Sequence, residues 1–195
     1  DRLRASEVLA AVLGPRRIAV LSGPCIAPEV AKRLPAAVAV AGEAPALTER
    51  VQEMLATPWF RIYTNPDVVG VELGGATKNV IALAAGMIDG LEAGDNCKAA
   101  LLTRGLVEIT RLGLAMGASR ETFAGLAGLG DLVTTCISPV GRNRSAGEQI
   151  GRGRTAAEVE QATASVIEGI ATTRSVMALA RQHRCLLYTS PSPRD

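Results

Sequence analysis

The chain has 195 residues, of which 48% are hydrophobic and 3% aromatic, and its net charge is +2 at neutral pH. Acidic and basic residues are interspersed, without the basic tract or aromatic–basic interleaving typical of nucleic-acid binding. No uninterrupted apolar run approaches the ~18 residues of a membrane span. These features argue against nucleic-acid-binding and membrane-spanning proteins. They predict a helical or α/β globular protein with one domain and part of a second.

The extended and helical segments alternate in the first third of the chain. The expected elements, in chain order, are helix 5–13, strand 18–21, helix 28–34, strand 36–41, helix 45–56 and strand 60–63. The inward face of the third helix is expected to hold Leu47, Val51, Met54 and Leu55. This alternation predicts an α/β unit belonging to a larger sheet.

From Asn65 onward the pattern predicts helices only. Asn65 is expected to cap the first of them, with Pro66 as its first residue. The expected elements are helices 66–91, 99–116, 119–125 and 142–150, one that begins with a capping box at 155–158, and 168–182, with a loop at 94–96. The sequence therefore predicts an α/β unit over 1–65 followed by an all-α unit over 66–184.

The usage of cysteine and histidine limits the chemistry. The four cysteines are scattered without a C-x-x-C pair, and His183 is the single histidine. This pattern argues against a disulfide framework, a zinc site and Ser-His-Asp or Cys-His catalysis in this segment. We therefore expect no metal and a reducing, cytoplasmic location. Proton transfer near neutral pH would then depend on lysine and carboxylate side chains.

Lys78 is the first candidate for such chemistry. It lies in an apolar helical segment, 70–83, and its side chain should extend back over Gly74 and Gly75. Two glycines inside a helix cost roughly 1 kcal/mol each relative to alanine, so some contact should compensate. Two interpretations stay open: a functional lysine beside a ligand that approaches the backbone, or a lysine that reaches the surface beside tightly packed helices.

Two later motifs could supply partners for Lys78. Gly128-Leu129-Gly130 resembles part of a dinucleotide fingerprint, but the complete G-x-G-x-x-G is absent from the sequence. These glycines are expected to form a tight loop that places Asp131 at a helix start, where an ordinary N-cap is the alternative interpretation. Arg142 and Asn143 begin another helix, where free N–H groups favour a phosphate or carboxylate; a solvated basic turn is the alternative.

Two further residues have simple structural explanations. Glu168 begins the last helix, where a carboxylate interacts favourably with the helix dipole. Cys25 follows Ser22-Gly23-Pro24 at the end of a strand, where ligands often bind in α/β proteins. With no histidine near it in the sequence, we interpret Cys25 as a small packed residue rather than a nucleophile.

Taken in order, these motifs resemble the bacterial NAD(P)-dependent glycerol-3-phosphate dehydrogenases. The matching segments are Leu-Ser-Gly-Pro at 21–24, Asn-Pro-Asp at 65–67, Leu-Gly-Gly-Ala-Thr-Lys-Asn-Val at 73–80, Leu-Thr-Arg-Gly-Leu at 102–106, Gly-Leu-Gly-Asp-Leu at 128–132, Arg-Asn-Arg at 142–144 and Glu-Gly at 168–169. The resemblance covers essentially all of 1–184. It implies hydride transfer between NAD or NADP and a small phosphorylated substrate, interconverting sn-glycerol 3-phosphate and dihydroxyacetone phosphate for phospholipid synthesis.

The resemblance also implies roles for single residues. Lys78 matches the catalytic lysine that exchanges a proton with the substrate oxygen, and Asp131 would contact the substrate or hold Lys78. Arg142 and Asn143 match the phosphate-binding pair. Further substrate contacts are matched by Gly23, Cys25 and Gly141. Cofactor contacts are matched by Ala27, Arg142, Val166 and Glu168. Many relatives have Ser or Thr at position 25 and Ser at 141, so Cys25 and Gly141 lack those hydroxyls.

The resemblance assigns 1–65 to the C-terminal part of a Rossmann-type NAD(P)-binding domain. It assigns 66–184 to a helical catalytic domain like the C-terminal domain of 6-phosphogluconate dehydrogenase, and it allows a homodimer. Residues 185–195 differ in composition and resemble a translated sequencing adapter, so they are excluded from the fold. The chain is expected to be truncated at both ends.

Two alternatives remain. One is another dehydrogenase with a Rossmann and a helical domain, of the 6-phosphogluconate or 3-hydroxyisobutyrate type, which also places a lysine on a buried helix. The other is a non-catalytic helical interaction module, in which Lys78 is structural.

Because the glycine fingerprint is absent, we expect the 195-residue chain alone to have no dehydrogenase activity. The measurement is NADH oxidation by the purified chain with dihydroxyacetone phosphate. Turnover above the protein-free background would contradict this expectation.

Overall fold

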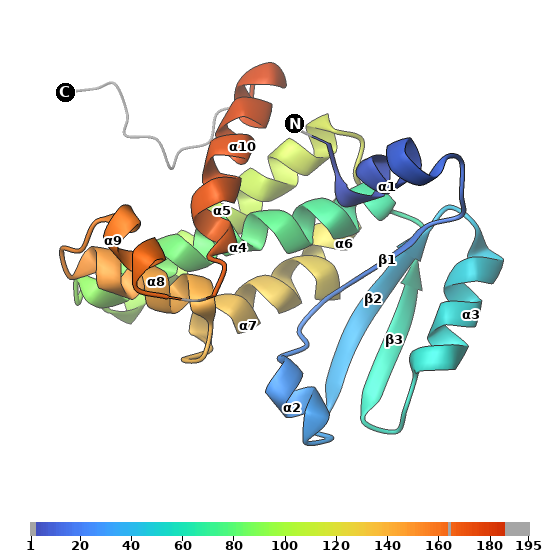
Figure 1. The fold of residues 1–195 in the computed structure, drawn as a ribbon, viewed down its shortest axis with the longest axis horizontal. Helices are drawn as coiled ribbons and strands as arrows, with labels where there is room; N and C mark the ends of the chain where they lie inside the picture. The colour runs from blue at the N-terminus through green and yellow to red at the C-terminus, as the bar shows by residue number, and fades with distance from the viewer. Residues whose placement is uncertain (1–2, 164, 186–195) are drawn as a thin grey trace.

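The computed structural model of the protein describes residues 3–163 and 165–185. A small sheet with flanking helices packs beside a larger group of helices, and one long helix, α4, runs through the centre of that group (Figure 1). This arrangement confirms the predicted fold class, an α/β portion followed by an all-α portion. The predictions for residues 186–195 lie outside the described residues.

The sheet has the order β1-β2-β3, with β1 (Ala19–Ser22) antiparallel to β2 (Ala36–Gly42) and β2 parallel to β3 (Phe60–Asn65). Its side chains alternate between two faces, as the strand period requires. On one face Val38 and Val40 cluster with Val51 of α3 (Pro45–Leu55), and on the other Ala39 and Ala41 cluster with Val71 of α4 (Val68–Gly90). The sheet therefore joins α3 to the helical portion.

The helices of the first third begin close to the predicted residues. α1 spans Ala5–Leu13, and α2 spans Ala27–Ala31, ending early because Arg33 has a positive φ of 60°. The predicted inward face of α3 is wrong in part, since Met54 is 70% exposed and Leu55 46% exposed. Apolar periodicity marks a helix face but does not show whether another element covers all of it.

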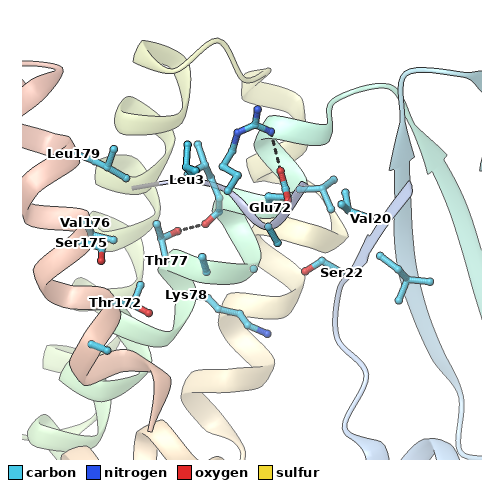
Figure 2. A pocket seen from close by; sticks show the side chains of 18 residues that line it. Leu3, Val20, Ser22, Glu72, Thr77, Lys78, Thr172, Ser175, Val176 and Leu179 are labelled. Atoms are coloured by element: carbon cyan, nitrogen blue, oxygen red, sulfur yellow. Dashed lines mark hydrogen bonds and ion pairs between the residues drawn. The ribbon is translucent and has the colours of Figure 1, made fainter. Parts of the chain in front are cut away.

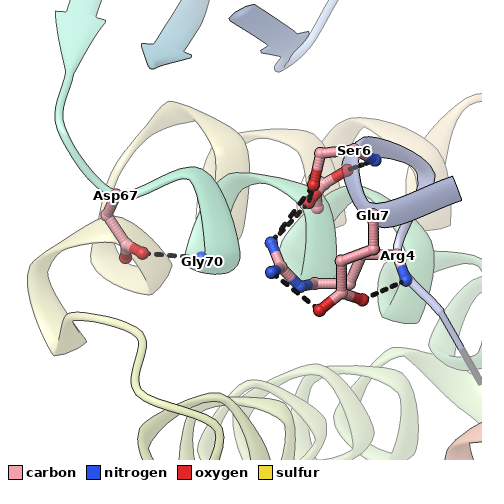
Figure 3. A network of polar contacts seen from close by, with 6 residues as sticks. Arg4, Ser6, Glu7, Asp67 and Gly70 are labelled. Atoms are coloured by element: carbon pink, nitrogen blue, oxygen red, sulfur yellow. Dashed lines mark hydrogen bonds and ion pairs between the residues drawn. The ribbon is translucent and has the colours of Figure 1, made fainter. Parts of the chain in front are cut away.

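Helix α4 begins at Val68, two residues later than predicted. Asp67, not Asn65, is its N-cap: the Asp67 Oδ1 accepts a hydrogen bond from the Gly70 N–H at 2.7 Å (Figure 3). The Asp67 Oδ2 also accepts bonds from the Ser119 N–H at 2.8 Å and the Thr122 hydroxyl at 2.7 Å. Asn65 instead accepts from the Asp67 N–H at 2.8 Å. One carboxylate thus fixes the start of α4 against the following helices.

Helix α4 is also long and apolar enough to cross a membrane by length and composition, with a mean hydropathy of 1.3 over its most apolar 18 residues. The sequence prediction concerned uninterrupted apolar runs, and in this helix Glu72, Lys78 and Asn79 interrupt the apolar residues. Half of that window is buried inside the protein, which is the behaviour of a core helix.

The remaining elements surround α4. They are α5 (Gly94–Ala115), α6 (Arg120–Ala124), the π-helical turn η1 (Leu126–Gly130), α7 (Asp131–Ile137), α8 (Arg142–Gly151), α9 (Ala156–Gln161) and α10 (Glu168–Gln182). The expected loop at 94–96 is instead the first turn of α5, and Gly94 begins it with a φ of 83°. The capping box of Thr155 and Glu158 is confirmed.

Glycines bring α4 and α8 unusually close together. A Cβ atom on Gly86 would lie 1.9 Å from the Arg144 carbonyl oxygen, and one on Gly147 would lie 1.9 Å from the Leu83 carbonyl oxygen. At these two positions the backbone of α4 is therefore in direct contact with the backbone of α8. This contact fixes the start of α8, where Arg142 and Asn143 lie, relative to the middle of α4.

We expect Gly86→Ala to lower the free energy of unfolding by at least about 2 kcal/mol, because the added methyl group would overlap a backbone carbonyl that cannot rotate away. Denaturant unfolding of the chain measures this loss. The matched control is Gly130→Ala, where a Cβ would meet Pro24 at an ordinary 3.6 Å. Equal stability of the two variants would contradict the backbone-contact explanation.

Candidate functional site

Lys78 and Asp131 form an ion pair, with 2.6 Å between the Lys78 Nζ and the Asp131 Oδ2. The Lys78 side chain is 20% exposed and that of Asp131 4% exposed. The Ser22 hydroxyl lies 3.4 Å from the same Oδ2, and the Thr135 hydroxyl lies 3.3 Å from the Asp131 Oδ1. A buried carboxylate with these partners holds the ammonium in one place.

The glycine pair in α4 serves packing. A Cβ on Gly74 would lie 2.4 Å from the Ala127 carbonyl oxygen, in the turn η1 that leads directly to Asp131. A Cβ on Gly75 would lie 2.7 Å from the Ser22 Oγ. The interpretation that a ligand occupies the space over Gly74 is therefore wrong, because backbone fills it. The helix accepts two glycines so that the segments carrying Asp131 and Ser22 can reach it.

A second polar group lies at the starts of α8 and α10. The Asn143 Oδ1 accepts a hydrogen bond from the Gly169 N–H at 2.8 Å, while its Nδ2 donates to the Glu168 Oε2 at 3.2 Å. The Arg142 guanidinium lies 2.5 Å from the Glu168 Oε1. Arg142 and Asn143 are thus two adjacent donors that meet one carboxylate.

A cleft of about 240 Å³ connects the two polar groups. Its lining includes every residue predicted to bind substrate, namely Gly23, Cys25, Lys78, Asp131, Gly141, Arg142 and Asn143. Asn79, Thr134 and Thr135 also line it, although the motifs did not single them out. The helical spacing from Asp131 to Thr135 could have identified Thr135, because residues four apart share a helix face.

Two of the residues expected to contact the cofactor lie outside this cleft. Ala27 and Val166 are exposed and are outside the lining of the cleft, whereas Glu168 reaches Arg142 and Asn143 at its edge. The structure therefore brings the substrate candidates together but does not bring Ala27 and Val166 to them.

A larger cavity, of about 660 Å³, lies between α4, β1 and α10 (Figure 2). Its lining is mostly apolar. At its edge the Glu72 carboxylate accepts bonds from the Arg4 guanidinium at 2.7 Å and the Ser6 N–H at 2.7 Å, which fix the start of α1 to α4 (Figure 3). Lys78 lines both cavities, but Asp131, Arg142 and Asn143 line the smaller one and not the larger one.

Metal ligands are not gathered anywhere in residues 3–163 and 165–185: no group of three or more His, Cys, Asp or Glu side chains there could hold an ion. The side chains that line the cleft include groups that can transfer protons and bind anions.

Comparison with known proteins agrees with the motifs. Residues 67–190 match the family model described as NAD-dependent glycerol-3-phosphate dehydrogenase C-terminus, and residues 1–48 match the corresponding N-terminus. The glycerol-3-phosphate dehydrogenase (NAD(P)+) of Frankia casuarinae is 56% identical over 182 residues, 92% of this chain and 54% of that protein. That of a Geobacter species is 56% identical over 180 residues, 91% of this chain and 54% of that protein.

A solved structure gives the same result. The crystal structure of glycerol-3-phosphate dehydrogenase from Coxiella burnetii has a TM-score of 0.92 and 45% sequence identity, covering 95% of this chain and 57% of that one. The chain thus spans about half the length of the curated relatives that it matches.

The surroundings of two cysteines, Cys25 and Cys136, raise the pKa values of their thiols. Although Cys25 is exposed, desolvation of its thiol raises its pKa, the negative charge of Asp131 raises it further, and Lys78 acts in the opposite direction. Burial raises the pKa of Cys136 to about 12. At neutral pH both groups are thiols rather than thiolates, which supports the interpretation that Cys25 is not a nucleophile. The expectation that Cys25 is packed is wrong, because its side chain is exposed at the cleft.

We expect exposed Cys97 to react with iodoacetamide faster than Cys25 at neutral pH, and Cys136 to react only after unfolding. Asp131→Asn should speed the alkylation of Cys25 several-fold, because it removes a negative charge that disfavours the thiolate. Lys78→Met should slow it. Mass spectrometry of tryptic peptides measures each rate. A Cys25 rate that neither substitution changes would contradict the described geometry.

Proposed function

Because the chain belongs to the NAD-dependent glycerol-3-phosphate dehydrogenase family, we propose that it carries the substrate-binding and proton-transfer part of such an enzyme. The reaction is the interconversion of sn-glycerol 3-phosphate and dihydroxyacetone phosphate. The observation that supports this most directly is the Lys78–Asp131 ion pair at 2.6 Å in the same cleft as Arg142 and Asn143. A proton donor at one end and anion donors at the other suit a small phosphorylated ketone.

In the proposed reaction the nicotinamide cofactor, NAD or NADP, supplies or accepts the hydride. In reduction the Lys78 ammonium gives a proton to the alkoxide oxygen that develops on the substrate. In oxidation the neutral Lys78 amine accepts that proton. The Asp131 carboxylate holds the Nζ in position through the 2.6 Å ion pair. Arg142 offers a fork of donors and Asn143 an amide donor to the substrate phosphate.

The cofactor would be held in part by residues at the edge of the cleft. The exposed guanidinium of Arg142 suits a phosphate of the dinucleotide, and exposed Val166 and Ala27 offer apolar surface. Glu168 lies beside Arg142 and suits a polar group of the cofactor. The glycine fingerprint that cradles a pyrophosphate is absent from the sequence, so these residues contribute only part of such a site.

The wider proposals follow from the family. We place the boundary between the nucleotide-binding part and the helical catalytic part at residues 65–66, which is supported by the change from sheet to helices there. We also propose a cytoplasmic enzyme that supplies glycerol 3-phosphate for phospholipid synthesis and forms a homodimer. The adapter origin of 185–195 stays a prediction.

We expect Lys78→Met, in an enzyme completed with a family nucleotide-binding half, to lower turnover by at least ~100-fold, because it removes the group that transfers the proton. Steady-state oxidation of NADH with dihydroxyacetone phosphate measures the loss, and circular dichroism checks that folding is intact. The matched control is Lys32→Met at the exposed C-cap of α2, which should leave turnover unchanged.

The outcome separates the alternatives. Unchanged turnover in the Lys78 variant would favour the non-catalytic module. Turnover of 6-phosphogluconate or 3-hydroxyisobutyrate by the unmodified enzyme, with none of glycerol 3-phosphate, would instead favour the related dehydrogenases.

A further inference from the structure

Glu168 engages the two donors that the proposed function assigns to the substrate phosphate. We infer that Glu168 acts as an internal competitor at this anion site, so that a phosphate reaches Arg142 and Asn143 only by displacing the Glu168 carboxylate. This inference rests on the proposed function, since it concerns the same site. It adds a residue that sets the affinity of the site for phosphate.

The geometry of Asn143 supports the competition. Asn143 is 5% exposed, and the Gly169 N–H holds its Oδ1 at 2.8 Å. Because the carbonyl side of the amide is fixed, its Nδ2 must point the other way, and there it donates to the Glu168 Oε2 at 3.2 Å. The other carboxylate oxygen, Oε1, lies 2.5 Å from Arg142. The two oxygens of Glu168 therefore take the places that two phosphate oxygens would need.

The charges in the cleft also support competition by Glu168. Among the described residues that line it, Lys78 and Arg142 carry the positive charges, and each is paired with a carboxylate. A phosphate dianion must therefore break one of the pairs or bind without a full counter-charge. Asp131 is 4% exposed, while Arg142 and Glu168 are 55% and 35% exposed. The exposed pair is the weaker of the two, because water screens it, and so Glu168 is the carboxylate that yields.

The test is binding of inorganic phosphate to the 195-residue chain, measured by isothermal titration calorimetry at constant pH and ionic strength. Glu168→Gln keeps the size of the side chain and removes its charge. It should tighten phosphate binding about tenfold, since the dianion no longer competes with a carboxylate. The matched control is Glu160→Gln on the exposed face of α9, which should change the affinity less than about twofold. Thermal unfolding checks that each variant folds.

A double variant, Arg142→Gln with Glu168→Gln, locates the gain. It should lose the tighter binding, because the gain acts through the guanidinium. The single variant Arg142→Gln is measured as well. If Glu168→Gln leaves the affinity for phosphate unchanged or weaker while Arg142→Gln lowers it, the inferred competition is wrong and the proposed phosphate site stands. If phosphate binds neither the unmodified chain nor Glu168→Gln, or binds both independently of Arg142, the proposed phosphate site is wrong as well.

Discussion

The ion pair between Lys78 and Asp131 constrains most of this structure. An ammonium on a largely buried helix is tolerated only when a carboxylate and hydrogen-bond donors meet it, and removing one member of such a pair costs about 3–5 kcal/mol. The two residues lie 53 positions apart, so the chain must bring η1 and α7 directly against α4. Gly74 provides the space for that approach, and Gly75 provides it for Ser22. The two glycines lower the intrinsic stability of the helix, and in return the segments that carry Asp131 and Ser22 can approach Lys78.

The sequence predicted the framework well because local signals mark it. The strand and helix order and the capping box at Thr155 follow from apolar periodicity and from capping residues. Asp131 begins α7 as predicted, but the expected tight loop before it is the π-helical turn η1. The errors occur where a distant contact decides. Asp67 replaces Asn65 as the cap because its second oxygen also bonds Ser119 and Thr122. Met54 is 70% exposed although it shares the apolar spacing of α3.

The candidate site shows the same division. The motifs identified Lys78, Asp131, Arg142 and Asn143, and the structure places them around one cleft. Sequence spacing could not show what fills the space over Gly74, because that depends on a carbonyl of η1 more than fifty residues later. It also could not show that Glu168 lies against Arg142 and Asn143, 25 to 26 positions away. The residue types of a site are visible in the sequence, but their pairing is not.

The two ion pairs of the cleft differ in a way that suits their positions. Lys78 and Asp131 are sheltered, so their contact is screened little by water and keeps the ammonium in one orientation. Arg142 is exposed and Glu168 is partly exposed, so water screens their contact, and the proposed exchange with another anion would cost less here than at Asp131. Both ends are attached to one frame, since the glycine contacts between α4 and α8 fix the start of α8 relative to Lys78. Under the proposed function, a ligand that enters at the exposed pair would then meet the sheltered one, and backbone packing would set the distance between recognition and proton transfer.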